Sequence, residues 1–136
     1  MSVPPLPPVD VLFRHWPDDT TPLPSLQPDT VVVLQASTDA LLRARPDTLS
    51  QNECRRARAF ISGTARDLFT LGRCMLRDIL GAILRAPPSQ VPLAIDANGK
   101  PYLVQVPDAH AVHFNIAHSG RHVLVALACA REVGID

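Results

Sequence analysis

Residues 113–136 read HFNIAHSGRHVLVALACAREVGID, and this stretch decides the fold. Two runs of mostly apolar residues flank a His-Ser-Gly turn, which predicts two strands of a hairpin. The second run, 122–130, is almost wholly apolar, as expected for a strand buried on both faces of a sheet. The last residues, up to Asp136, read as the first few positions of a third strand. We therefore expect a hairpin within a larger sheet, in a chain that looks cut short.

A second buried strand and a long helix are predicted upstream of the hairpin. The segment TVVVLQA, residues 30–36, is β-branched and apolar on both faces, which indicates a strand well inside a sheet. Between residues 64 and 85 apolar positions recur at intervals of three and four, which predicts one amphipathic helix ended by Pro87 and Pro88. The opposite stripe of this helix is typical of a solvated face and consists of Arg66, Thr70, Arg73 and Arg77.

Three further segments complete the expected organisation. Ser50 and Glu53 form a capping box, which predicts the start of a shorter helix with a basic exposed side. Asn98-Gly99 supplies a tight turn between two short strands. Residues 1–29 hold eight of the fourteen prolines and are expected to form an arm rather than a helix or central strand. The remaining residues, 30–136, form the folded domain.

Composition limits the classes of partner. The chain has 13 basic and 13 acidic residues among 136, so no overall field favours nucleic acid or a membrane surface. Three widely spaced cysteines, an odd number, fit a reducing compartment better than a disulfide framework. The sequence shows neither a signal peptide nor an apolar run of about 20 residues. We expect a cytoplasmic protein, with any anion site confined to a local cluster.

Polar residues near the hairpin are the first candidates for chemistry. His118 and Ser119 lie at a strand end beside a glycine, where an imidazole and backbone amides can face a ligand. A catalytic triad is not indicated, because no carboxylate lies near His118 in the sequence and the adjacent side chains of His118 and Ser119 point in diverging directions. The spacing of His113, His118 and Asp136 also matches no common zinc pattern. His113 and Asn115 are interpreted as structural groups of the strand.

An anion site is the interpretation that remains. Cationic side chains suited to phosphate are Arg56, Arg66, Lys100 and His118. Asp136 offers the hard oxygen that Mg²⁺ prefers when substrate phosphates supply its other ligands.

Four segments in this order resemble the N-terminal half of a 4'-phosphopantetheinyl transferase of the larger, surfactin-synthetase-type class. They are FTLGRCMLR (69–77), NGKPYL (98–103), HFNIAHSG (113–120) and REVGID (131–136). Such enzymes transfer phosphopantetheine from coenzyme A to a serine of an acyl, peptidyl or aryl carrier protein with the help of Mg²⁺. The resemblance implies an α+β fold, one half of a pseudo-dimer, with a mostly antiparallel sheet packed against a long helix.

The resemblance also implies roles for individual residues. Gly99, Lys100 and Pro101 would border the adenine and phosphates of coenzyme A, and His118 would contact a phosphate. Asp136 corresponds to the first metal-binding aspartate. Arg56 and Arg66 fall nearest the basic positions that hold the 3'-phosphate of the coenzyme. No residue of this chain is expected to act as the general base.

Two departures from the family pattern shape the functional expectation. Ala117 stands where the family has serine before the histidine, so one hydroxyl contact to phosphate is lost. The later acidic residue and the KEA-type segment of the family are absent from this sequence. We therefore expect half of a transferase, inactive alone, which needs the missing C-terminal half. The alternatives are a coenzyme A-binding or carrier-docking module without catalysis, and self-association of two such halves.

Overall fold

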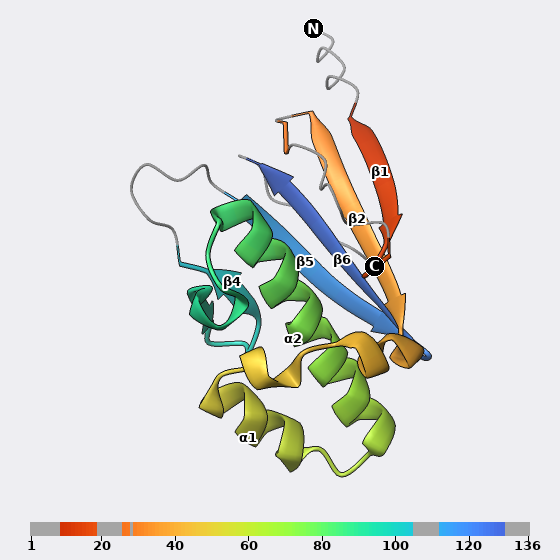
Figure 1. Cartoon of the computed structure of the whole chain (residues 1–136), viewed down its shortest axis with the longest axis vertical. Helices are drawn as coiled ribbons and strands as arrows, with labels where there is room; N and C mark the ends of the chain where they lie inside the picture. Colours follow the sequence, from red (N-terminus) through yellow and green to blue (C-terminus); the bar gives the residue numbers. More distant parts are fainter. Residues whose placement is uncertain (1–8, 19–25, 28, 105–111, 130–136) are drawn as a thin grey trace, which may run out of the picture.

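The main sheet of the protein has four strands (Figure 1). A computed structural model describes residues 9–18, 26–27, 29–104 and 112–129. In spatial order the strands are β1 (Asp10–His15), β2 (Thr30–Ser37), β6 (His122–Cys129) and β5 (Val112–Ser119). β1 runs parallel to β2, whereas β2–β6 and β6–β5 are antiparallel pairs. The expected α+β fold with a mostly antiparallel sheet is confirmed.

The hairpin that the sequence predicted is formed by β5 and β6. Ser119 pairs with His122, and Gly120 adopts a positive φ of 59° in the turn between them. β6 lies between β2 and β5 and is buried along most of its length. Its apolar sequence is explained by this central position, because both of its faces are covered.

Helix α2 (Gly63–Leu84) packs across one face of the sheet (Figure 1). Its apolar stripe meets the inward-facing residues of β2, β5 and β6. The largest fully buried side chains are Leu34, Leu71, Met75, Leu76, Ile79, Leu80, Leu127, Val32, Val123 and Val125. Gly72 permits a close approach to β5, since a Cβ there would lie 2.6 Å from Cδ1 of Ile116. The predicted long helix is therefore correct in position and in its buried stripe.

Shorter elements cover α2 on its other side. α1 (Gln51–Ala59) begins at Ser50, and both hydrogen bonds of the predicted capping box are present. The 3-10 segments are η1 (Thr38–Arg43), η2 (Pro46–Thr48) and η3 (Pro88–Gln90), and all of them contact α2. β3 (Leu93–Ile95) and β4 (Pro101–Leu103) form a separate two-stranded sheet beside β5. The turn between them contains Gly99 at a φ of 81°, as the Asn-Gly pair predicted.

Strand β1 was not predicted, and it lies within the stretch expected to form an arm. β1 is an edge strand, so it needs hydrogen-bond partners on one side only, and flanking prolines do not prevent its pairing with β2. Trp16 follows it, is buried in the core, and donates from Nε1 to Oδ2 of Asp78 in α2 at 2.8 Å. Among the described residues, no helix has the length and apolar character needed to cross a membrane.

Substitution of Gly81 tests how tightly the end of α2 is packed. A Cβ at Gly81 would lie 2.8 Å from the carbonyl oxygen of Ala86, a backbone atom that cannot rotate away. We expect Gly81→Ala to lower the free energy of unfolding by about 1–3 kcal/mol, although alanine favours helices. Urea denaturation measures the change. Gly63→Ala is the matched control at the other end of the helix, where nothing lies within 4 Å, and a Gly81→Ala protein as stable as this control would contradict the packing.

Candidate functional site

The carboxylate of Glu53 links the two helices. Its Oε1 accepts hydrogen bonds from the backbone of Ser50 at 2.8 Å and from Nε of Arg77 at 2.7 Å. Its Oε2 lies 3.7 Å from Nε of Arg73 in an ion pair. All three ionised side chains are about 95% buried, since Glu53 is 5%, Arg73 5% and Arg77 4% exposed. The cluster is thus a buried charge network in which two arginines share one acid.

This network corrects the expectation of a solvated stripe on α2. Arg73 and Arg77 lie on the side of the helix away from the sheet, but α1 folds back over that side and supplies Glu53. Arg77 also donates from Nη1 to the carbonyl oxygens of Pro88 at 3.0 Å and Val91 at 3.3 Å. The protein itself therefore occupies much of the hydrogen-bonding capacity of Arg77.

Arg73 has a different environment. Burial lowers the pKa of its guanidinium, Glu53 raises it, and the positive charges of Arg56 and Arg77 lower it further. The guanidinium carbon lies 5.0 Å from the ring centroid of Phe69, and that of Arg56 lies 5.2 Å from the same centroid. Two cations therefore meet one aromatic ring, an arrangement that orients both of them.

Arg56 has unused hydrogen-bonding capacity. Its Nη1 is buried and has no hydrogen-bond partner in the part of the chain that the structure describes. Its Nη2 lies beside the β3–β4 turn, 3.9 Å from where a Cβ on Gly99 would be. A buried donor without a partner is costly, and an anion at this place would satisfy it.

A pocket of about 400 Å³ opens next to these arginines, where α2 meets β4 and the β5–β6 hairpin. It is lined by Phe60, Ser62, Thr64, Ala65, Leu68, Phe69, Arg73, Pro101, Ile116, His118 and Val123. Most of these side chains are apolar, so the charge of Arg73 acts in surroundings of low dielectric, where it interacts strongly with an anion. The exposed His118 adds an imidazole at the same pocket.

The structure brings four of the predicted site residues together. Pro101 and His118 line the pocket, and Arg56 lies between its wall residue Phe69 and the turn at Gly99. Their convergence joins α1, the β3–β4 hairpin and β5, which are far apart in sequence.

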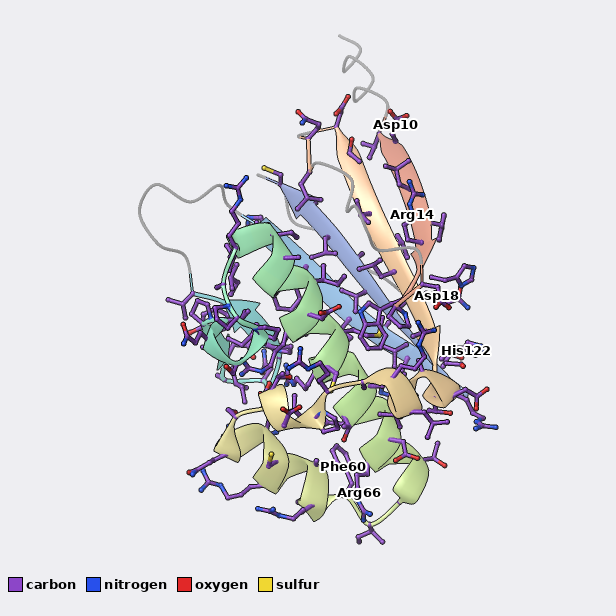
Figure 2. The ribbon with its side chains drawn as sticks, in the orientation of Figure 1. Asp10, Arg14, Asp18, Phe60, Arg66 and His122 are labelled. Carbon is purple, nitrogen blue, oxygen red and sulfur yellow. The ribbon has the colours of Figure 1, made fainter. Side chains whose placement is uncertain are left out.

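The other predicted residues are placed differently. Lys100 is exposed in the turn, where its backbone donates to Oδ1 of Asp96 at 2.9 Å. Arg66 lies at the corner between α1 and α2, where it donates to the carbonyl oxygen of Phe60 at 3.1 Å (Figure 2). It is not among the residues that line the pocket. Asp136 lies outside the described residues.

Sequence reasoning missed Arg73, Glu53 and Phe69 as site residues. Arg73 was assigned to solvent, and Glu53 was recognised only as a cap. The signal that could have found them is the pairing of an acidic capping residue in one helix with two arginines, four residues apart, in the next.

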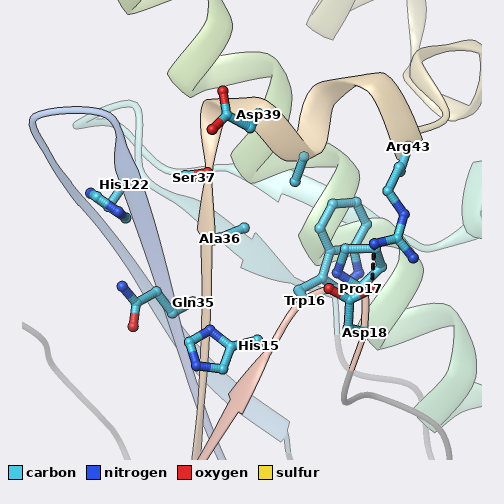
Figure 3. A pocket seen from close by; sticks show the side chains of 11 residues that line it. His15, Trp16, Pro17, Asp18, Gln35, Ala36, Ser37, Asp39, Arg43 and His122 are labelled. Carbon is cyan, nitrogen blue, oxygen red and sulfur yellow. Dashed lines mark hydrogen bonds and ion pairs between the residues drawn. The ribbon is translucent and has the colours of Figure 1, made fainter.

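A second pocket of about 450 Å³ lies at the end of the sheet and contains none of the predicted site residues (Figure 3). His15, Gln35 and His122 reach it from β1, β2 and β6, and an ion pair joins Asp18 to Arg43 at its side. No group of three or more His, Cys, Asp or Glu side chains within the described ranges could hold a metal ion. The first pocket is the stronger candidate, because Pro101 and His118 line it.

Comparison with known proteins identifies the family. Residues 36–130 match the family described as 4'-phosphopantetheinyl transferase, N-terminal. The chain belongs to this family. The 4'-phosphopantetheinyl transferase HetI of Nostoc sp. is 39% identical over 89 residues, which cover 65% of this chain and 38% of that protein. The 4'-phosphopantetheinyl transferase Sfp of Bacillus subtilis is 32% identical over 100 residues, which cover 65% and 43%. The chain thus spans about two fifths of the length of these relatives.

A solved structure supports the fold. A holo-(acyl-carrier-protein) synthase from Bacillus anthracis, in complex with CoA (3',5'-ADP), superposes with a TM-score of 0.50 at 18% sequence identity. The match covers 73% of this phosphopantetheinyl transferase half and 93% of the synthase chain. The expected identity of the chain as an N-terminal half is confirmed by the family match.

Removal of Arg77 tests the charge network as a structural element. Arg77→Met fills similar space but leaves Glu53 with a poorer set of donors. It also removes a side-chain donor from the carbonyl oxygens of Pro88 and Val91, which keep only a backbone donor each. We expect the free energy of unfolding to fall by about 3–5 kcal/mol, the range for breaking a buried ion pair. Chemical denaturation measures it. The exposed Arg58→Met on α1 is the control and should change stability by no more than about 0.5 kcal/mol. Equal stabilities of the two variants would show that the network is dispensable.

Proposed function

We propose that this chain binds coenzyme A as the N-terminal half of an enzyme that transfers 4'-phosphopantetheine to a serine of an acyl, peptidyl or aryl carrier protein. The observation that carries the proposal is the pocket where Arg73, Pro101 and His118 meet, beside the unpartnered Nη1 of Arg56. A phosphate-rich ligand with an adenine ring suits this combination of fixed cations and apolar walls. The three free cysteines agree with the cytoplasmic location that we also propose.

The residues of the chain supply binding and orientation. Arg56 and Arg73 hold fixed positive charge against a phosphate group, and the exposed imidazole of His118 donates a hydrogen bond to another phosphate oxygen. Pro101 and Gly99 present a rigid turn with little side-chain bulk, which suits the approach of a flat base. Transfer forms a bond between the carrier serine oxygen and the phosphorus of the pantetheine arm and breaks the bond from that phosphorus to the bridging oxygen of the pyrophosphate, which releases 3',5'-ADP. The serine proton passes to a base that this half does not supply. The groups named here keep that leaving fragment in place.

Mg²⁺ would neutralise the pyrophosphate and assist the departure of 3',5'-ADP when bound. The described residues do not provide a metal site by themselves. The magnesium proposal rests on Asp136, which lies outside them, and on acidic residues of a C-terminal half. A coenzyme A-binding module without catalysis is the second candidate, favoured by Ala117 in place of the family's serine.

Coenzyme A binding tests the proposed ligand directly. Titration calorimetry of the 136-residue chain should detect binding, and His118→Ala should weaken it by about 10- to 100-fold, since hydrogen bonds to charged groups contribute about 1.5–3 kcal/mol. His113→Ala, on the same strand but outside the pocket, is the matched control. Absence of coenzyme A binding by the unaltered chain would refute the proposal.

Carrier modification tests the role of the missing half. We expect no holo-carrier protein when the 136-residue chain is incubated with coenzyme A, Mg²⁺ and an apo carrier domain, because this sequence supplies no general base and only one of the family's metal carboxylates. Mass spectrometry of the carrier measures the product. Addition of a C-terminal half from a relative provides the positive control. Product formed by the chain alone would contradict this expectation. An affinity for coenzyme A that is the same with and without Mg²⁺ would favour the binding module.

A further inference from the structure

Glu53 caps α1 and pairs with arginines of α2, and it also contacts a residue of the pocket wall. The residue lies outside the pocket lining, yet its carboxylate contacts Arg73, which is in that lining. Within the described part of the chain, Arg73 forms one ion pair, with Glu53, and one cation–π contact, with the ring of Phe69. The position of the Arg73 guanidinium therefore depends on one carboxylate and one aromatic ring.

The charge balance leaves positive charge available for a ligand. Arg73 and Arg77 share the carboxylate of Glu53, and Arg77 is also occupied by backbone carbonyls. The remaining charge lies on Arg73 and Arg56, which share the ring of Phe69. The buried guanidinium of Arg73 and the buried, unpartnered Nη1 of Arg56 are unfavourable unless an anion joins them.

We propose that Glu53 is a positioning residue: it holds Arg73 in the pocket wall so that the guanidinium, together with that of Arg56, meets the 3'-phosphate of coenzyme A. This inference rests on the coenzyme A binding proposed above. An arginine that is fixed before the ligand arrives loses less side-chain entropy on binding than one that must be ordered by it. The acid thus strengthens binding of an anion through the cation that it orients.

The direction in which Glu53→Gln changes the affinity for anions separates this role from the alternatives. Glutamine has nearly the same shape and can retain the capping box, but it removes the charge that holds Arg73. A carboxylate that merely competed with the ligand for Arg73 would, when removed, tighten the binding of anions. A positioning carboxylate, when removed, weakens it. A purely structural role changes stability and leaves the preference among phosphate ligands as it was.

The experiment compares 3',5'-ADP with 5'-AMP, which lacks the 3'-phosphate, by NMR or calorimetric titration of the 136-residue chain. We expect Glu53→Gln to weaken 3',5'-ADP binding about tenfold, equivalent to about 1.4 kcal/mol, and 5'-AMP binding much less. Asp78→Asn is the matched control, because Asp78 is a carboxylate of α2 that bonds to Trp16 away from the pocket. It makes the same change in net charge and should leave both affinities unaltered.

A double variant tests whether Glu53 acts through Arg73. In an Arg73→Gln background, the further change Glu53→Gln should leave the ratio of the two affinities as it is. If Glu53→Gln does not fold, Arg73→Gln alone must lower the ratio of the affinity for 3',5'-ADP to that for 5'-AMP about tenfold. An unchanged ratio refutes the inference.

The remaining outcomes are also decisive. Tighter binding, unchanged binding, or equal weakening of both ligands by Glu53→Gln would overturn the positioning role while leaving coenzyme A binding intact. Failure of the unaltered chain to bind 3',5'-ADP and coenzyme A would overturn the proposed function and this inference together.

Discussion

The bond between Glu53 and Arg77 is the constraint on which the arrangement of the helices depends. Oε1 of Glu53 caps α1 through Ser50 and at the same time accepts from α2 at 2.7 Å. Arg77 extends the link to the carbonyl oxygens of Pro88 and Val91, which precede β3. A buried ion pair adds little net stability, but leaving either member alone is costly. In this protein a shift of α1 along α2 would therefore leave a buried charge without its partner. The segment that leads into the β3–β4 hairpin is held at Arg77 as well.

Local signals allowed much of the fold to be predicted. The capping box at Ser50, the Asn98-Gly99 turn and the β5–β6 hairpin depend on residues within a few positions of one another. Strand β1 was missed because its pairing is with a strand 20 residues further on, and the surrounding prolines dominated its pattern. The burial of Arg73 and Arg77 was missed for the same reason, since Glu53 lies 24 residues from Arg77. Helical periodicity places residues on a face but does not reveal whether another helix covers that face.

Prediction of the site was limited in a similar way. Pro101 was found through the resemblance to a family and His118 through its place at a strand end, and the structure places both at one pocket. Arg66 and Arg73 belong to the same predicted stripe, yet one lies exposed at a corner and the other is buried beside the pocket. Charge pattern alone cannot separate them, because the difference comes from how α1 returns over α2. The phenylalanine between Arg56 and Arg73 carries no charge and gave no signal of a role in an anion site.

The basic side chains near the pocket differ in how far they are exposed to water, and therefore in how strongly they interact with an anion. Lys100 is exposed, so water screens its charge and its effect on a distant anion is small. Arg73 is 5% exposed and lies among apolar walls, where a charge interacts several times more strongly at the same distance. That strength is useful only if the guanidinium does not move, because a mobile arginine would lose rotamer freedom on meeting the ligand. A second buried charge of opposite sign restrains it with little loss of positive potential, because Glu53 shares its carboxylate with Arg77. The acid that fixes the helices thus also leaves the pocket with a rigid surplus of positive charge.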